Sequence, residues 1–389
     1  MDKRLGILTF HRSINNGAFL QCYSLSNNFE KATGYRVEVI DYNTRKSNNK
    51  YIKEIVKSRP VNMKSVYQRF VMFNSFRSVL PYLPLSPRTI IDNDFHSLFE
   101  YINDRYAAIV VGSDAVWNWN SRGFPNAYWL NAEFDFPIYS YAASIHGMDY
   151  TKADEEQLSY CREALQRYSF IGVRDNATAD FVKKIDSDLL PIHTCDPTVI
   201  LDMNNIPVDM DKLKQKLQKK HGISFNKPLI GIMTSSKRIG QMVRERYCKQ
   251  YDIVALFKYN CYADYFLYDL NPFEWARVFS FFKLTFSQYF HGTLLSLKNT
   301  IPTISIDVWD FSSKFKGKLE DLWERLNFSE CYFHADRLND SDAVNSVYRL
   351  ADSMLSNPPT ERIINAIAQE GKTFMPFLEK LIKERKADA

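Results

Sequence analysis

Glycine is scarce in this sequence, at 13 of 389 residues, about half the average share. Neither a G-x-G-x-x-G nor a G-x-x-x-x-G-K-[ST] pattern occurs. Such motifs let backbone N–H groups approach the phosphates of a dinucleotide or a nucleoside triphosphate closely. Their absence argues against an ordinary dinucleotide-binding protein and against a P-loop protein.

Closely spaced metal-ligating residues and long apolar runs are also lacking. The six cysteines lie at least 13 positions apart, and no C-x-x-C or H-E-x-x-H pattern is found, so we predict no metal site. The first apolar run, Leu5–Phe10, is too short for a signal peptide, and no run approaches a membrane span. We therefore expect a cytoplasmic protein with free thiols.

Charge of one sign is not concentrated in this chain. The 50 basic and 45 acidic residues give a net charge of +5, and the most basic run, Glu379–Lys386, has acidic residues at helical spacing. That pattern is typical of a solvated helix face, so we predict no nucleic-acid partner. The hydrophobic share of 45% and charged share of 24% are those of a globular protein.

Strand-like and helical segments alternate along both halves of the chain. Short apolar runs predict buried parallel strands, each followed by a helical segment. The alternation predicts an α/β protein with two facing Rossmann-like domains, each a parallel sheet flanked by helices. The main predicted strands are Leu5–Phe10, Tyr35–Asp41, Tyr106–Gly112, Pro137–Ser144, Phe170–Arg174, Pro228–Thr234, Asp252–Phe257, Leu284–Ser287 and Ile301–Asp307.

Polar composition sets the predicted domain boundary. The stretch Asp202–Asn226 is polar and divides the chain into an N-terminal domain over residues 1–205 and a C-terminal domain over 206–359. A C-terminal helix over about 360–389 is expected to pack back on the first domain, and the 43–87 segment is a candidate insertion covering that domain. Two such domains predict a ligand site in the cleft between them.

Four loops that follow predicted strands carry polar residues suited to such a site. Each has a simpler alternative interpretation as a turn with a helix cap, and for Asp175 we predict capping. The loops contain His11 with Asn15, Asn16, Gly17 and Gln21; Gly112-Ser113-Asp114 with Trp117; Arg174-Asp175; and Ser287 to Thr293.

The last of these loops gives the sharpest prediction. His291 precedes Gly292 and Thr293, which are expected to open a helix, so its imidazole would lie beside backbone N–H groups. A helix N-terminus binds phosphate or carboxylate, and a histidine there can exchange protons near neutral pH. Arg174 at a strand end could form a fork for the same anionic groups. An ion pair with Asp175 or another neighbour is an equally good interpretation of Arg174.

Taken in order, these segments resemble the polysaccharide pyruvyl transferase family. No single segment is specific, but seven occur in register over about residues 5–306. They are Asn16-Gly17-Ala18 with Leu20-Gln21; Val110 to Asp114 with Trp117-Asn118; Ser140 to Ser144; Val173-Arg174-Asp175 with Thr178; Asp196-Pro197-Thr198; Pro272 to Trp275; and Phe290 to Thr293 with Ser296-Leu297 and Pro302.

The resemblance implies transfer of pyruvate from phosphoenolpyruvate to two hydroxyls of a sugar, forming a ketal during assembly of a surface polysaccharide or exopolysaccharide. It also implies a GT-B-like fold with the acceptor toward the N-terminal domain and the donor toward the C-terminal one. Phosphoenolpyruvate is a substrate, so no cofactor is expected. The implied partners are this donor and a saccharide acceptor, with a peripheral membrane contact if that acceptor is lipid-linked.

Residue roles follow from the same resemblance and from the chemistry of the loops. His291 is the expected catalytic acid or base, and Asp114 a hydrogen-bonding group or base on the acceptor side. Arg174, Gly292, Thr293, Tyr289 and Lys318 are expected to bind the donor. Asn16, Gly17, Gln21, Ser113 and Trp117 are expected on the acceptor side.

Two further functions remain open from the sequence. One is a glycosyltransferase that uses a nucleotide sugar in the same two-domain fold, although no glycine loop for a diphosphate is evident. The other is a carbohydrate-binding relative without activity. It is favoured by Tyr289, which stands where studied family members often carry arginine.

Overall fold

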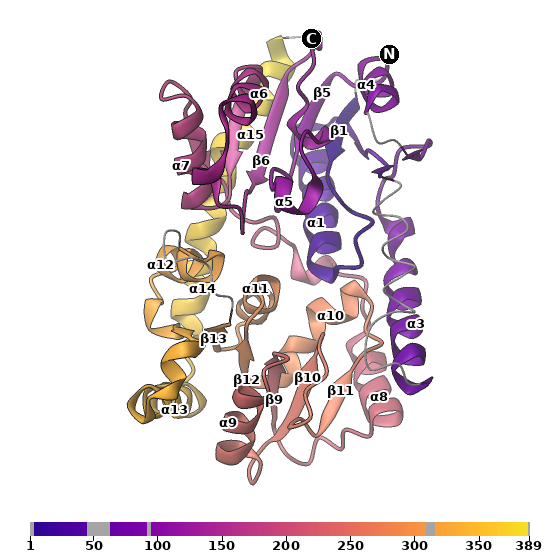
Figure 1. Ribbon diagram of the computed structural model, residues 1–389. Coiled ribbons are helices and arrows are strands. Elements are labelled where there is room, and N and C mark those ends of the chain that lie inside the picture. The colour runs from indigo at the N-terminus through magenta and orange to yellow at the C-terminus, as the bar shows by residue number, and fades with distance from the viewer. Residues whose placement is uncertain (1–3, 45–62, 92–94, 309–315, 388–389) are drawn as a thin grey trace. The chain divides into compact units, whose positions relative to one another are not determined.

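The computed structural model describes residues 4–44, 63–91, 95–308 and 316–387. They form two compact units, each built on a six-stranded parallel sheet with helices (Figure 1). Unit 1 takes its described residues from Met1–Val61, Leu80–Leu201 and Gly371–Ala389, and unit 2 from Asn62–Val79 and Asp202–Glu370. The predicted α/β class, with two Rossmann-like parallel-sheet domains, is confirmed.

The chain passes between the units at more points than a single boundary near residue 205 provides. Helix α3 (Met63–Arg77), which lies in the 43–87 segment assigned to the first domain, groups with unit 2. There the Ser75 hydroxyl donates a hydrogen bond to the carbonyl of Asp269 at 3.0 Å. Residues 45–62 of that segment lie outside the described residues. The C-terminal segment is likewise divided: α14 (Thr360–Gly371) groups with unit 2 and α15 (Met375–Ala387) with unit 1.

The sheet of unit 1 has the strand order β2-β1-β5-β6-β7-β8, with every pairing parallel. Its inner strands are apolar and buried on both faces, as expected where helices cover a parallel sheet. A separate parallel pair joins β3 (Tyr42–Asn43) to β4 (Ile90–Ile91). The strands of the main sheet are β1 (Arg4–Leu8), β2 (Arg36–Val39), β5 (Ala108–Val111), β6 (Ile138–Ala143), β7 (Tyr168–Val173) and β8 (Pro191–His193).

Aromatic packing attaches α15 to the rest of unit 1. This helix contacts α1 and β7 and is drawn in yellow in Figure 1. The Phe377 ring lies 5.3 Å from Phe29, 5.0 Å from Tyr141 and 5.3 Å from Phe170, measured between centroids. The other helices of unit 1 among the described residues are α1 (Asn16–Thr33), α4 (His96–Asn103), α5 (Trp119–Arg122), α6 (Glu155–Leu165) and α7 (Asn176–Ile185).

The sheet of unit 2 has the order β11-β10-β9-β12-β13-β14, again parallel throughout. Its strands are β9 (Leu229–Met233), β10 (Asp252–Leu256), β11 (Tyr265–Leu267), β12 (Phe282–Ser287), β13 (Thr303–Asp307) and β14 (Tyr332–His334). Besides α3 and α14, its helices are α8 (Met210–His221), α9 (Lys237–Tyr247), α10 (Pro272–Val278), α11 (Phe290–Lys298), α12 (Lys318–Arg325) and α13 (Ser341–Ser356).

Helix length and hydropathy decide whether a helix could cross a membrane. Within the described parts of the chain, none of the helices combines the length and the apolar character that crossing a bilayer requires.

Candidate functional site

The strand order of each unit marks the place where its ligand site is expected. In open parallel sheets, ligands bind outside the carboxyl ends of the strands where the strand order reverses. In unit 1 this point lies between β1 and β5, and in unit 2 between β9 and β12. Three of these four strands, β1, β5 and β12, are followed by loops that the sequence singled out. The loop after β9 is the exception.

In unit 1 the loop after β5 is closely packed against β6. Gly112 has φ +120°, and a Cβ there would overlap the carbonyl oxygen of Tyr141, so only glycine fits. Asp114 follows with φ +75°, a left-handed conformation that is uncommon for a non-glycine residue. Its N–H donates to the carbonyl of Ala142 at 3.1 Å, and its carbonyl accepts from the N–H of Ser144 at 2.9 Å. The backbone that carries the Asp114 carboxylate is thus held in place on both sides.

Arg174 lies directly after β7 and is buried, with 1% of its surface exposed. Its Nη1 is 3.0 Å from Asp114 Oδ1 and donates to Asp196 Oδ2 at 3.2 Å, and its Nε is 4.0 Å from Asp175 Oδ2. Burial alone would lower the pKa of the guanidinium, but the surrounding carboxylates outweigh burial and raise it. Of the two interpretations of Arg174, the structure therefore shows the ion pair, and Asp114 and Asp196 are its close partners. Contact with a donor stays a prediction.

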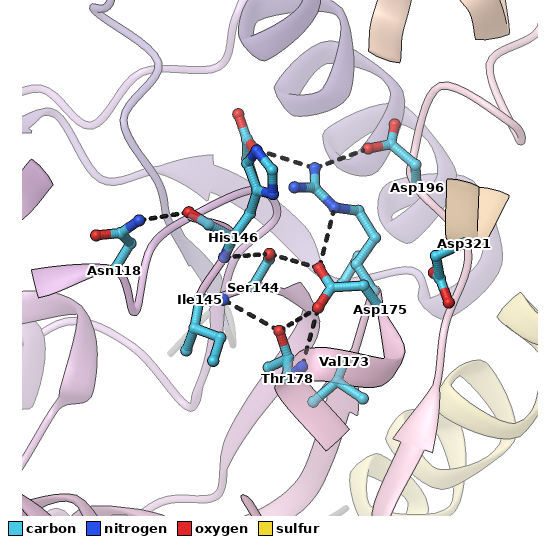
Figure 2. A network of polar contacts seen from close by, with 12 residues as sticks. Asn118, Ser144, Ile145, His146, Val173, Asp175, Thr178, Asp196 and Asp321 are labelled. Atoms are coloured by element: carbon cyan, nitrogen blue, oxygen red, sulfur yellow. Dashed lines mark hydrogen bonds and ion pairs between the residues drawn. The ribbon is translucent and has the colours of Figure 1, made fainter. Parts of the chain in front are cut away.

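Asp175 caps α7, as predicted. Its Oδ1 accepts from the N–H of Thr178 at 2.9 Å, and its Oδ2 accepts from the Ser144 hydroxyl at 2.6 Å (Figure 2). Burial would raise the pKa of this carboxyl group, but the Arg174 charge and these hydrogen bonds hold it below its ordinary value. Figure 2 also shows that the Ser144 hydroxyl oxygen accepts a hydrogen bond from the N–H of His146 at 2.9 Å. Asp175 therefore has a structural role, as the cap of α7 and as the acceptor of the Ser144 hydroxyl.

The predicted acceptor-side residues lie on α1 and in the segment after β5. Gln21, on α1, donates from its amide to Asp196 and so joins the Arg174 cluster. Asn16 and Gly17 form the first turn of α1, which Asn15 caps.

Ser113 and Trp117 are buried. The Trp117 ring stacks on Trp129 at 5.1 Å and its Nε1 donates to the carbonyl of Tyr128 at 3.2 Å. Trp117 is therefore a core residue of unit 1.

A second buried polar group in unit 1 was not recognised as a group from the sequence. His11 Nε2 lies 3.0 Å from Asp41 Oδ1, and the side chains of Arg12 and Thr89 also donate to Asp41. Burial would raise the pKa of Asp41, but these hydrogen bonds hold it well below its usual range. Asp41 follows β2 as Asp196 follows β8, so its position after a strand was the signal that could have identified it.

In unit 2 a hydrogen bond spans the reversal point of the sheet. The hydroxyl of Thr234, after β9, donates to Oε1 of Gln288, after β12, at 2.6 Å. Asn260 supports the same loop, because its amide donates to the carbonyls of Thr234 and Ser236, each at 3.1 Å. Gln288 was named in the sequence only as part of its loop, and Thr234 and Asn260 were missed because their partners lie far along the chain.

His291 lies inside the first turn of the helix, whereas the sequence predicts it just before that turn. Helix α11 begins at Phe290, not after His291, and Tyr289 occupies the N-cap position. Among the described residues, no side-chain hydrogen bond of Tyr289 caps the helix. The first N–H groups of a helix have no acceptor inside the helix, and their partial positive charge favours an anion. The first turn of α11, with the half-buried His291 in it, therefore has the properties of an anion site.

Tyr289 contacts Phe257 with its ring, edge to face at 5.0 Å. Burial raises the pKa of its hydroxyl, against the opposite effect of hydrogen bonds with Gln288 and Ser235. Tyr289 is therefore neutral at physiological pH and supplies no cation beside α11.

The remaining predicted donor residues surround the same helix end. Gly292 packs against β9, because a Cβ there would overlap the Met233 sulfur and lie 2.9 Å from Ser287 Oγ. The Thr293 hydroxyl is buried and 2.9 Å from the hydroxyl of Ser305. Lys318, in the first turn of α12, places Nζ 5.8 Å from the centre of the Phe290 ring. The structure thus brings a lysine beside the residue that precedes His291.

Metal ligation finds no support in this part of the molecule. The described residues contain no group of three or more His, Cys, Asp or Glu side chains that could hold a metal ion.

Similarity to solved structures extends over the whole chain but concerns the fold. The UDP-GlcNAc 2-epimerase from Neisseria meningitidis bound to UDP-GlcNAc matches with a TM-score of 0.55 and 11% identity, over 98% of this chain and 100% of the other. The HepE protein of Anabaena in complex with UDP matches with a TM-score of 0.53 and 10% identity, over 100% of both chains. The expected GT-B-like fold is thereby confirmed.

Similarity at the level of sequence is more selective. The chain matches no curated protein sequence. The family model described as polysaccharide pyruvyl transferase matches residues 15–310, which include Asp114, Arg174 and His291. The chain belongs to the polysaccharide pyruvyl transferase family.

Proposed function

We propose that this protein transfers pyruvate from phosphoenolpyruvate to two hydroxyls of a sugar, forming a ketal in the assembly of a surface polysaccharide or exopolysaccharide. Family membership supports the reaction class. The observation that carries the proposal is the position of His291 in the first turn of α11, after the strand at which the sheet order reverses. A proton donor and an anion-binding helix end are thereby combined in one turn.

The reaction sets clear chemical requirements. A proton is added to the methylene carbon of phosphoenolpyruvate, which makes the carbon bearing the phosphate electrophilic. One sugar hydroxyl then attacks that carbon and loses its proton, and the C–O bond to phosphate breaks. A second hydroxyl attacks the same carbon, loses its proton and closes the ketal, with inorganic phosphate as the other product. The protein must supply an acid, a base and an anion site.

We assign the donor side to unit 2. The N-terminal turn of α11 would receive the phosphate or the carboxylate, and Lys318 would add a positive charge near Phe290. His291 would deliver the proton to the methylene carbon. Gly292 would act indirectly, since its lack of a side chain lets α11 approach Met233. Tyr289 would bound the pocket as a neutral group, and Thr293 would hold the turn through Ser305.

We assign the acceptor side to unit 1. The Arg174 cluster combines one cation with the carboxylates of Asp114, Asp175 and Asp196. A surplus of negative charge disfavours a phosphate or a carboxylate, whereas sugar hydroxyls can donate hydrogen bonds to it. Asp114, which is more exposed than Arg174, is our proposed base for an attacking hydroxyl. In this arrangement Arg174 is a positioning residue that acts through Asp114.

Donor binding gives the first test. Thermal unfolding is measured alone, with millimolar phosphoenolpyruvate, with phosphate and with UDP. A ligand present at about 100 times its Kd adds roughly 2.7 kcal/mol to stability, which is a readily measured shift. We expect a larger shift with phosphoenolpyruvate than with phosphate. A shift with UDP alone would favour the nucleotide-sugar glycosyltransferase instead.

Catalysis gives the second test. Phosphate release from phosphoenolpyruvate is followed while candidate sugars are added. His291→Ala should reduce acceptor-dependent release by about 10²-fold or more, the usual contribution of a general acid. The matched control is His96→Ala, at an exposed position of unit 1. Full activity of His291→Ala would remove the role assigned to this histidine.

A carbohydrate-binding protein without transferase activity is the alternative that Tyr289 favours. Its neutral hydroxyl leaves the position two residues before His291 without a cation. Sugar binding without any phosphoenolpyruvate binding in the presence or absence of that sugar would support this alternative.

A further inference from the structure

Helix α3 presents an unusual outward face. Met63, Tyr67, Phe70, Asn74 and Arg77 follow one another at intervals of four and three residues, so they share one face of the helix. All five are exposed, and the apolar ones strongly: Met63 is 92% exposed, Tyr67 57% and Phe70 54%. We call these five residues the α3 stripe. Large apolar side chains at such exposure, gathered on one face, typically mark an interaction surface.

The other side of α3 is already occupied by unit 2. Phe76 is buried, and Ser75 donates its hydrogen bond to the carbonyl of Asp269. These residues point away from the α3 stripe around the helix, since they lie one or two positions from Asn74 and Arg77. The stripe is therefore an outward surface of a helix that is held on its opposite side.

The charge of the region is of one sign. Within α3, Lys64, Arg69 and Arg77 are basic, and no acidic residue occurs. The sequence from Ile55 to Ile91 contains no Asp or Glu, although the average for the chain would place about four there. Lys64 and Arg77 are exposed together with the apolar residues. The helix therefore offers apolar side chains and positive charge on the same exposed side.

We propose that α3 binds the surface of an anionic lipid bilayer, with the α3 stripe inserted at the level of the headgroups. Apolar side chains that enter the acyl boundary, flanked by cations that contact anionic headgroups, are the features by which a helix lies in a membrane interface. A second copy of the chain fits less well, because a symmetric contact would bring the same basic side chains together without an acidic partner in α3. The proposal is independent of the reaction proposed above.

Vesicle flotation of the full-length chain tests the proposal. Vesicles of phosphatidylcholine alone are compared with vesicles containing 30% phosphatidylglycerol. We expect flotation with the anionic vesicles, weakened by salt, and little with the neutral ones. The triple variant Met63→Ser, Tyr67→Ser, Phe70→Ser should lose at least about tenfold in lipid partitioning, because the inserted side chains are gone. Lys64→Gln should lose about fivefold.

Matched controls separate the α3 stripe from general stickiness. Leu190→Ser removes an apolar side chain that is 77% exposed in unit 1 and should leave flotation unchanged. The thermal unfolding of the triple variant should match that of the wild type, because the three side chains are exposed. Equal flotation of the triple variant and the wild type would overturn the proposal, and so would absence of flotation with anionic vesicles. A wild-type dimer that dissociates in the triple variant, measured by light scattering, would overturn it in favour of a second copy.

Discussion

Asp114 combines a left-handed backbone with an ion pair to a buried arginine. A residue with a Cβ pays for this conformation unless its side chain can hydrogen-bond locally, which Asp and Asn can do. The chain therefore holds a carboxylate in a conformation that few side chains tolerate. Such sites are commonly found where a functional group must be fixed before the ligand arrives.

Asp114→Asn and Asp114→Ala separate the charge from the backbone. Asp114→Asn keeps a residue that tolerates a positive φ and should lower kcat by about 10²-fold or more if this carboxylate is the base. Asp114→Ala should in addition lose about 1–2 kcal/mol of stability, because alanine has no local hydrogen bond to offset the conformation. Activity and chemical denaturation are measured for both, with exposed Asp104→Asn as the control. Normal kcat in Asp114→Asn would contradict the assignment.

For Arg174 we predict a loss of stability on substitution whose size depends on pH. Arg174→Gln should cost about 3–5 kcal/mol at pH 7, because buried carboxylates lose their cation. In the wild type the pKa of Asp175 lies below its ordinary value, so its stabilisation is present above about pH 4 and is lost as pH falls through the lower pKa of the folded state. In the variant, protonation of the same carboxylates relieves their repulsion.

The deficit of Arg174→Gln should therefore shrink as pH falls from 7 toward 4.5. Urea unfolding at both pH values measures it, and a deficit that stays constant or grows would contradict the ion-pair account. Kinetics distinguish the two roles of Arg174: in Arg174→Lys, a raised KM for phosphoenolpyruvate with unchanged kcat would indicate donor binding. A lower kcat with an unchanged donor KM would indicate positioning of Asp114.

At the scale of the element, the approach of α11 to β9 depends on the absence of one side chain. Gly292→Ala should cost about 1–3 kcal/mol of stability, since the new methyl group would overlap Met233. Met233→Ala should relieve that overlap, so the double variant should be more stable than the sum of the two single effects by about 0.5–3 kcal/mol. Denaturant unfolding of the four proteins measures this coupling. Additive effects would show that Met233 is not what excludes a side chain at position 292.

The elements themselves were the most predictable feature of the molecule. Asp175 caps α7 as predicted, and Asn271 forms a capping box with Glu274 at the start of α10. Such caps depend on residues within one turn, so the local sequence contains the whole signal. The start of α11 was placed too late, because Tyr289 has no capping side chain that marks the boundary.

Contacts between distant segments were much less predictable. The sequence placed Arg174 at a strand end, but its close partners Asp114 and Asp196 come from other loops that only the sheet brings together. The grouping of α3 with unit 2 likewise depends on contacts such as that of Ser75 with Asp269. Neither is encoded by periodicity or by capping, so the loops could be identified as candidates while their pairing could not.

At the scale of the whole molecule, α15 completes the aromatic core of unit 1. Phe377→Ala should destabilise unit 1 by about 3–5 kcal/mol, because a buried ring packed against Phe29, Tyr141 and Phe170 is removed. Hydrogen exchange should increase in α1, β6 and β7 while unit 2 is unchanged. Met375→Ala, at a partly exposed position of the same helix, is the control. An equal increase in both units would show that they unfold as one.

Unit 1 is built from chain segments that lie far apart in the sequence, and this affects the order in which its parts are synthesised. Its last strand ends at His193, but Gly371 and the helix that covers its aromatic side chains are translated about 180 residues later. At 5–20 residues per second, that delay is roughly 9 to 36 seconds. During this interval Phe29, Tyr141 and Phe170 have left the ribosome without their final cover. By contrast, the larger part of unit 2, Asp202–Glu370, is one continuous segment. The nascent chain therefore exposes an apolar surface for a chaperone to bind until α15 emerges.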